Sequence, residues 1–254
     1  MKVMAIINLK GGTGKTATTV NLAAILAHDH NQRVLIVDAD SQANSTEFYG
    51  ADPSKGSLAD VLRHNPDGGY FAVCSIQPTT FEGIDILAAD DSLMDLDLTK
   101  VELGSIKMQA LSDMVDLARE RDLYDWVLID CPPAFNAASA AALVAADEAI
   151  IPIKLDAFSL RGMSNLMHQI SNMRQINPTL KLAGLLPTMY YKSETMRSAE
   201  QSLRDSRFKV YHHIRRTPKV DDMTFAQQPL VISSPTSAAC RDYRMFADEL
   251  MGGI

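Results

Sequence analysis

Two kinds of apolar pattern alternate along this chain. Short apolar runs of strand length are separated by stretches in which apolar residues recur every three or four positions, which is typical of amphipathic helices. The predicted strands are Val3–Ile7, Arg33–Val37, Ile84–Leu87, Trp126–Ile129, Ala149–Ile153, Leu182–Leu186 and Val210–Ile214. The clearest predicted helices are Thr16–Ala27, Ser105–Arg121, Leu160–Gln175 and Ser237–Met251. This alternation predicts an α/β fold with a doubly wound, mostly parallel sheet and helices on both faces.

Length and composition are those of one ordinary globular domain. A chain of 254 residues with 46% hydrophobic content can bury one substantial core, so we predict a single domain over residues 1–254. The best candidate for a linker, Asn65–Gly69, is short and is interpreted as a turn. An apolar, methionine-containing stripe in the predicted helix Leu160–Gln175 is interpreted as core filling.

The segment between the first predicted strand and helix has the composition of a phosphate-binding loop. Glycines allow a tight turn that points backbone N–H groups at phosphate oxygens, and the helix N-terminus adds its positive dipole end. Lys15 is expected to reach the β and γ phosphates, and the Thr16 hydroxyl is expected to ligate Mg²⁺. Leu9 occupies the place of the first glycine of the common G-x-x-x-x-G-K-[ST] pattern. The predicted nucleotide-binding residues are Gly11, Gly12, Thr13, Gly14, Lys15, Thr16 and Ala17.

Three aspartates follow predicted strands, at the edge where open α/β sheets bind ligands. Asp38 and Asp40 come after Arg33–Val37, and Asp130 comes after Trp126–Ile129. Each alone could be a helix cap or a turn former, but together with the loop they predict a phosphate site with Mg²⁺. The chemistry expected there is hydrolysis by positioning and electrostatics, because the six histidines show no spacing of a catalytic triad or a metal site.

Read from Lys10, the loop is KGGTGKT and resembles the loop KGGxGKT of the ParA/MinD family of deviant Walker ATPases. The stretches DADSQAN and DCPP are similar to the family motifs DxDPQxN and DxPP. Ser41 replaces the usual proline and Ala43 a usual glycine, so the carboxylates are kept while the loop geometry differs. The resemblance implies a P-loop NTPase fold of the deviant Walker A type, with ATP and Mg²⁺ as cofactors.

The resemblance also implies a role for each site residue. Lys10 of one subunit is expected to reach the nucleotide of the other, a role close to that of an arginine finger. Asp40 is expected to orient the attacking water, Asp38 to support the metal shell, and Asp130 to act as the Walker B residue. The implied catalytic residues are Lys10, Lys15 and Asp40, and the implied metal residues are Thr16, Asp38 and Asp130.

Two later segments, Asp147–Gly162 and Pro229–Tyr243, are similar to the ParA branch of this family. The branch implies an ATP-driven homodimer, DNA binding without sequence preference, and slow hydrolysis stimulated by a ParB-type centromere-binding protein. Such a cycle would segregate plasmid or chromosomal DNA. By the same likeness, the adenine pocket is expected near Thr188 and the loop after Ile214.

A net charge of −7 argues against a generally positive surface, but basic residues gather between Lys192 and Lys219. Where family members have a basic residue in the loop after Ile214, this chain has Arg216 and Lys219, so the resemblance makes these two the first candidates for DNA contacts. Because acidic residues are interspersed, a solvated surface of mixed charge is the other interpretation of this stretch.

Other functions within reach of this sequence have specific requirements. A MinD-like membrane-cycling ATPase needs a basic amphipathic C-terminal helix, whereas the tail Asp248–Ile254 is acidic, so no stable membrane association is expected. An iron–sulfur reductase needs paired cysteines, and Cys74, Cys131 and Cys240 are far apart. An ATPase that positions a protein cargo on the nucleoid remains open. With no export signal or membrane-length apolar run, we predict a cytoplasmic, nucleoid-associated protein.

Overall fold

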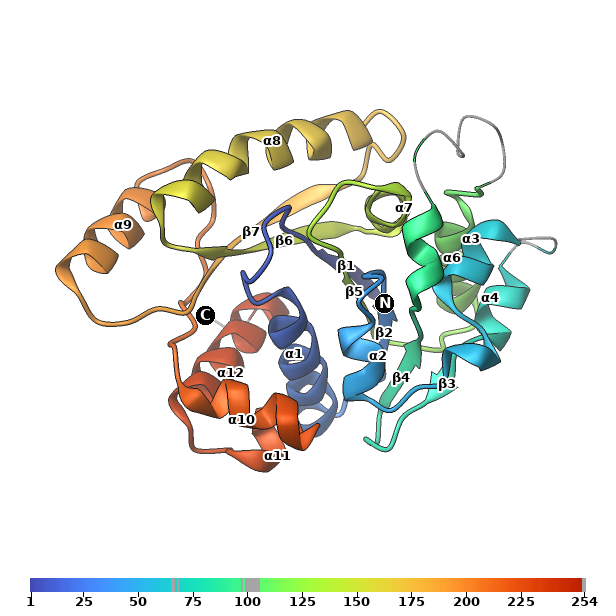
Figure 1. Cartoon of the computed structure of the whole chain (residues 1–254), viewed down its shortest axis with the longest axis horizontal. Helices are drawn as coiled ribbons and strands as arrows, with labels where there is room; N and C mark the ends of the chain where they lie inside the picture. The colour runs from blue at the N-terminus through green and yellow to red at the C-terminus, as the bar shows by residue number, and fades with distance from the viewer. Residues whose placement is uncertain (65–66, 68, 97, 99–105, 253–254) are drawn as a thin grey trace.

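Within the described residues, a seven-stranded sheet forms the centre of the molecule (Figure 1). The structure is a computed structural model that describes residues 1–64, 67, 69–96, 98 and 106–252, without the side chains of residues 157–162. The strand order is β3-β4-β2-β5-β1-β6-β7, and β3 pairs antiparallel with β4 while the other neighbours are parallel. The strands are β1 Lys2–Ile6, β2 Val34–Asp38, β3 Gln77–Pro78, β4 Ile84–Leu87, β5 Trp126–Asp130, β6 Glu148–Lys154 and β7 Lys181–Thr188.

Helices cover both faces of this sheet. One face carries α1, α11 and α12, with α10 beside them, and the other carries α3, α6, α7 and α8 (Figure 1). The helices are α1 Lys15–His30, α2 Asn44–Phe48, α3 Leu58–Arg63, α4 Tyr70–Cys74, α6 Ala110–Glu120, α7 Ala137–Ala145, α8 Ala157–Met173, α9 Glu194–Arg204, α10 Pro218–Ala226, α11 Leu230–Ser233 and α12 Ala238–Met251. Short 3₁₀ turns occur at Pro53–Lys55 and Asp91–Asp95.

Alternate residues of each central strand enter two separate hydrophobic cores. In β1, Val3 and Ala5 belong to the core under α6 and α7, whereas Met4 and Ile6 belong to the core under α1 and α12. Because both faces are buried, the strand reads as a continuous apolar run in the sequence. The doubly wound α/β prediction is therefore confirmed.

Four of the predicted elements need correction or comment. The prediction of a strand at Val210–Ile214 was wrong. This segment runs beside β7 and pairs through isolated bridges, such as that of Val210 with Leu185. It does not form a regular strand because its two histidines contact carboxylates on α9 and α12. Helix α6 begins at Ala110, later than the predicted Ser105, which lies outside the described residues. The predicted turn at residues 65–69 lies largely outside them too. In α8, buried residues of the stripe such as Ile170 confirm the core interpretation.

The strand order brings the predicted site residues to one edge of the sheet. Strand β5 lies between β1 and β2, and Asp130 pairs in register with Ile6 on one side and with Asp38 on the other. The chain leaves the carboxyl ends of these parallel strands at the same edge, where ligands bind in folds of this kind. The loop after β1 and the aspartates of β2 and β5 therefore meet.

Candidate nucleotide site

The loop between β1 and α1 has the backbone of an anion cradle. Gly12 and Gly14 have φ values of 67° and 84°, a left-handed conformation that favours glycine. Gly14 caps α1 without a side-chain hydrogen bond from the described residues, so the first N–H groups of the helix can face a phosphate. The Thr188 hydroxyl at the end of β7 donates to the Thr13 carbonyl at 2.8 Å and anchors the loop.

Lys15 is buried inside this loop, with 7% of its surface exposed. Its ammonium Nζ donates to the carbonyl of Lys10 at 3.2 Å. Burial lowers the pKa of Lys15, and the negative charges of Asp130 and Asp40 act in the opposite direction. A poorly hydrated ammonium beside uncapped N–H groups attracts phosphate strongly, which is the role predicted for Lys15.

Lys10 points its ammonium at the segment after β6. Its Nζ lies 3.2 Å from Oδ1 of Asp156, and Nζ of Lys154 lies 3.8 Å from the other oxygen of that carboxylate. The Lys10 N–H donates to Oδ1 of Asn8 at 3.0 Å, which fixes the start of the loop. Sequence reasoning missed Asp156, because a lone aspartate far along the chain carries no pattern.

Asp130 has one oxygen engaged and one oxygen available. Its Oδ2 accepts the Ser45 hydroxyl at 2.8 Å, whereas Oδ1 is a buried acceptor that finds no hydrogen-bond partner in the part of the chain that the structure describes. Leaving a buried acceptor unsatisfied is unfavourable, so the arrangement fits a hydrated cation facing Oδ1. The described residues contain no cluster of three acidic, His or Cys ligands. Mg²⁺ fits such a site, because it keeps several waters and needs few protein oxygens.

Asp38 organises the segment that carries Asp40. Its Oδ2 accepts both the N–H and the hydroxyl of Thr46 at 2.8 Å, and its Oδ1 accepts the Asp40 N–H at 3.1 Å. Asp40 itself is 7% exposed, and its Oδ1 accepts the N–H of Gln42 at 3.1 Å. Asp38 thus holds Asp40 at the cavity edge, and a further part for Asp38 in the metal shell stays a prediction.

The Asp38 and Asp130 carboxyls predict a pH effect on the nucleotide-free protein. Burial and the charge of Asp130 raise the pKa of Asp38 to about 7, and burial raises the pKa of Asp130 to about 6. These values exceed the ordinary 3.8, so the folded state holds more protons than the unfolded state between pH 3.8 and about 7. The pair therefore stabilises the fold at the low end of this window and less as pH rises through it.

Asp130→Asn tests this effect, because it keeps the shape and removes the charge. Its thermal unfolding midpoint is expected to rise relative to wild type as pH increases across the window. The matched comparison is Asp125→Asn at the surface, where the hydrogen bond from Arg33 lowers the pKa of Asp125 to about 2, so the trend should be absent. If the difference in unfolding midpoint between Asp130→Asn and wild type is the same at both ends of the pH window, the prediction is contradicted.

Two cavities flank the start of α1. A first cavity of about 620 Å³ includes the loop, Asp40 and residues of α2 and α10 in its lining. A second of about 480 Å³ is bounded by Thr188, Met189 and the segment Ile214–Thr217. Gly14 lines both. Each has the size of a small-molecule site, and the second lies where the adenine pocket was predicted.

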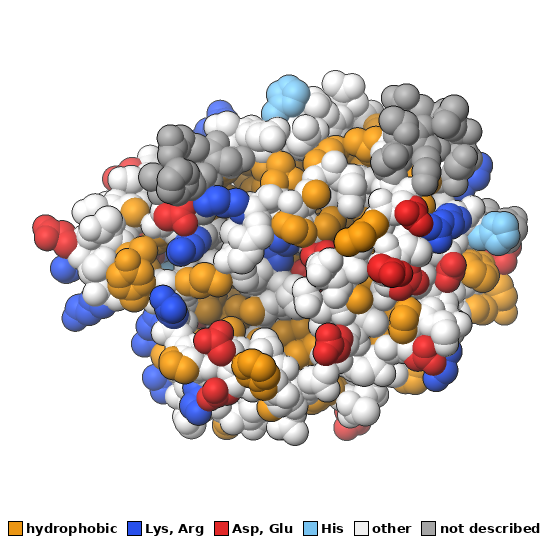
Figure 2. Space-filling view, in the orientation of Figure 1, with side chains coloured by type: hydrophobic (Ala, Val, Ile, Leu, Met, Phe, Trp, Pro, Cys, Tyr) orange, Lys and Arg blue, Asp and Glu red, His pale blue; other side chains and the backbone are white. Residues whose placement is uncertain are grey.

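The basic segment divides into structural and available residues. Arg204 pairs with Glu200, and Arg215 pairs with the buried Asp242. Arg216 is exposed, whereas Lys219 makes an exposed ion pair with Asp222 at 2.9 Å, a contact of little energy. Figure 2 shows basic side chains spread over the α9 and α10 end of the molecule with acidic ones among them. The surface is of mixed charge, with Arg216 the better placed of the two predicted DNA contacts.

Comparisons with known proteins agree with this geometry. A family model described as an AAA domain matches residues 1–182. The chromosome partitioning protein ParA of Caulobacter vibrioides is 33% identical over 261 aligned residues, which cover 99% of this chain and 94% of that protein.

Solved structures show the same arrangement. Apo McdA from Cyanthece superposes with a TM-score of 0.85 at 21% identity, over 99% of this chain and 100% of that one, which shows a shared fold. Cobyrinic acid a,c-diamide synthase from Mycobacterium smegmatis, with a bound ATP analogue and magnesium, superposes with a TM-score of 0.81 at 30% identity, over 99% and 94% of the two chains. With its phosphate loop and strand-end aspartates, the chain belongs to the ParA/MinD-type P-loop ATPases.

Proposed function

We propose that this protein is a ParA-type partitioning ATPase, built as one P-loop domain over residues 1–254, that dimerises with ATP and binds DNA. The observation that carries the proposal is the pair of lysines in the loop. Lys15 is buried in the cradle, while the Lys10 ammonium is directed to Asp156 on the segment after β6. A lysine in that position can neutralise charge on a nucleotide held by a second copy.

The reaction proposed is hydrolysis of the β–γ phosphoanhydride bond of ATP. A water attacks the terminal phosphorus, the bond to the β-phosphate oxygen breaks, and ADP and phosphate leave. Lys15 and the loop N–H groups hold the phosphates, and Asp40 orients the water. Thr16 and Asp130 would hold Mg²⁺ and its waters, and the cation would neutralise phosphate charge. The ATP analogue and magnesium in the synthase relative support these ligands.

The dimer is tested by sizing the protein with a non-hydrolysable ATP analogue and Mg²⁺. We expect wild type to shift from monomer to dimer, and Lys10→Ala to bind the analogue but remain monomeric, because the charge supplied to the second nucleotide is lost. Lys2→Ala is the control, since it removes a lysine that pairs with Glu148 at the end of β1 far from the loop. A Lys10→Ala dimer as stable as that of wild type would refute the role of Lys10.

DNA binding is expected with ATP and Mg²⁺ and not with ADP. It should weaken steeply as salt rises, because phosphate contacts release counterions. Arg216→Ala is expected to weaken binding to all sequences alike and to reduce the salt slope by about one, whereas Arg121→Ala, directly after α6, should leave both unchanged. A mobility assay in several salt concentrations measures both quantities. Equal binding with ATP and ADP would argue against the partitioning cycle.

The site of action proposed is the nucleoid, with a ParB-type protein stimulating hydrolysis. None of the helices in the described ranges combines the length and apolarity needed to cross a bilayer. Apolar residues of α12, such as Tyr243 and Phe246, are buried in the core shared with α1. This burial disfavours the MinD-like alternative, which needs an apolar helix face for lipid. The cargo is proposed to be DNA rather than a protein complex, because the chromosome partitioning protein ParA of Caulobacter vibrioides is 33% identical over nearly the whole chain.

A further inference from the structure

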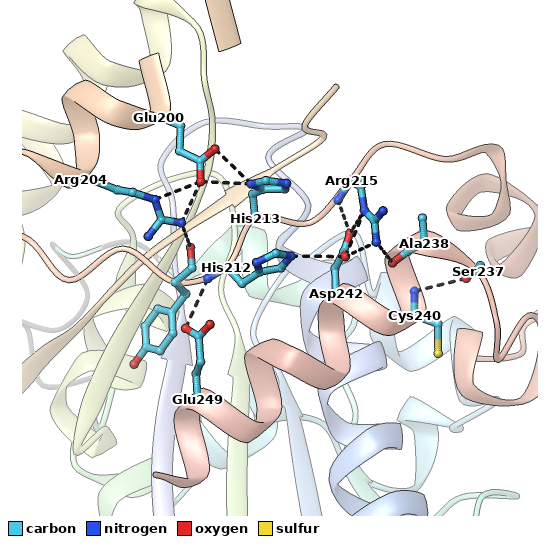
Figure 3. Close-up of polar contacts among 11 residues, drawn as sticks. Glu200, Arg204, His212, His213, Arg215, Ser237, Ala238, Cys240, Asp242 and Glu249 are labelled. Atoms are coloured by element: carbon cyan, nitrogen blue, oxygen red, sulfur yellow. Dashed lines mark hydrogen bonds and ion pairs between the residues drawn. The ribbon is translucent and has the colours of Figure 1, made fainter. Parts of the chain in front are cut away.

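The carboxylate of Asp242 on α12 is fully buried and accepts several hydrogen bonds from one neighbour, Arg215 (Figure 3). Its Oδ2 accepts the backbone N–H of Arg215 at 2.9 Å and the guanidinium Nε at 2.8 Å. Its Oδ1 accepts Nη2 of Arg215 at 2.6 Å and lies 3.5 Å from Nε2 of His212. A buried carboxylate is tolerated when donors surround it in this way, so the contact fixes Arg215 firmly.

Arg215 belongs to the wall of the second cavity. The segment Ile214–Thr217 lines that cavity together with Thr188 at the end of β7. One side of the segment is held to β7 and the residues after it, because Ile214 N donates to the Pro187 carbonyl at 2.8 Å and Arg216 N donates to the Tyr190 carbonyl at 2.8 Å. The other side is held by Asp242. The wall segment Ile214–Thr217 is therefore held by hydrogen bonds to β7 and the residues after it on one side and to α12 on the other.

Helix α12 is in turn fixed to the helix that carries the phosphate loop. The Tyr243 hydroxyl lies 3.4 Å from the Thr18 hydroxyl in the first turns of α1, and Arg244 Nε donates to Asp29 Oδ2 at 2.7 Å. A continuous set of contacts thus runs from the loop along α1 to α12 and through Asp242 to the wall. This set determines the distance between the phosphate cradle and the second cavity.

We propose that Asp242 is a positioning residue for the nucleobase: through Arg215 it holds the wall of the second cavity, which adjoins the phosphate loop at Gly14 and is where we place the base. The assignment rests on the proposed ATP site. A second set of contacts supports the residue before this wall segment: His213 pairs with Glu200 at 3.1 Å (Figure 3). The His213 ring also stacks on Tyr190, with ring centroids 3.7 Å apart. Asp242 is not among the residues that line either cavity, so its loss should reduce the part of the affinity that depends on the base.

Calorimetry with two ligands tests the assignment: ATP, and inorganic tripolyphosphate, which has no base, each with Mg²⁺. Asp242→Asn keeps the size of the side chain and removes its charge, and it is expected to weaken ATP binding about tenfold while tripolyphosphate binding is unchanged. Arg215→Ala should behave likewise, and Arg215→Lys should recover part of the loss. Arg241→Ala, which removes an exposed α12 guanidinium that donates to the Thr236 carbonyl away from the wall, should alter neither affinity.

The outcomes separate this assignment from the proposed function. Equal ATP affinity in Asp242→Asn and wild type overturns the assignment. An equal loss of affinity for ATP and for tripolyphosphate also overturns it, because Asp242 would then support the fold in general. If thermal unfolding measurements show that Asp242→Asn is not folded, the ATP and tripolyphosphate affinities of Arg215→Lys and Arg215→Ala are compared instead, with the same criteria. Wild type that binds neither ligand refutes the ATP site itself and this assignment with it.

Discussion

Lys15→Ala is expected to abolish ATP binding. Lys15 is the buried cation of the loop, where burial lowers its pKa and Asp130 and Asp40 oppose that shift. Hydrogen bonds to charged groups contribute about 3 kcal/mol at the upper end, so the affinity should fall by about a hundredfold or more. Calorimetry with ATP and Mg²⁺ measures the loss, and tripolyphosphate should be lost in parallel, because Lys15 acts on phosphates.

The matched control is Lys2→Ala, at the far end of β1, where Lys2 pairs with Glu148 at 2.8 Å on the surface. Its ATP affinity should equal that of wild type, because an exposed pair far from the loop contributes little. ATP affinity unchanged in Lys15→Ala would remove the loop from the phosphate site.

Asp40→Ala is expected to bind ATP normally and to lose hydrolysis by about a hundredfold or more, the effect of removing a group that positions or activates a reacting water. The residue lies at the edge of the first cavity, held by the Asp38 contact to its N–H. With turnover blocked, the ATP-bound dimer should persist for longer than in wild type. Phosphate release and sizing over time measure the two effects.

Glu47→Gln is the control for Asp40, since Glu47 is an exposed carboxylate on α2 in the lining of the same cavity. It is expected to keep the hydrolysis rate of wild type, because the prediction requires a carboxylate at Asp40 and not just negative charge in the cavity. Wild-type turnover in Asp40→Ala would take Asp40 out of the reaction.

The central strands could be predicted because burial on both faces leaves a long apolar run, as in Val34–Asp38. Short helices such as α2 could not be predicted. Helix α2 depends on the contact of Thr46 with Asp38, a link between residues that local propensity does not encode. The segment Val210–Ile214 misled the prediction for the same reason, since His212 and His213 find partners on α12 and α9.

The phosphate end of the site was predictable because its residues are adjacent in one loop, and the strand-end aspartates followed from the logic of parallel sheets. The supporting residues were not. Ser45 and Asp130 are 85 positions apart, and Lys10 and Asp156 are 146 positions apart. Contacts of that kind are created by the fold, and the supporting partners Ser45 and Asp156 carry no pattern of their own in the sequence.

The carboxylate of Asp156 lies between two ammonium groups, those of Lys10 and Lys154. In the proposed dimer, Lys10 would trade this anion for a phosphate of the neighbouring copy, and Lys154 would stay behind as the counterion. Association would then exchange one ion pair for another, so that Lys10 and Asp156 each face an opposite charge both before and after it. Such an exchange predicts that the enthalpy of dimerisation is small and that the dimer dissociates readily once the terminal phosphate has been released.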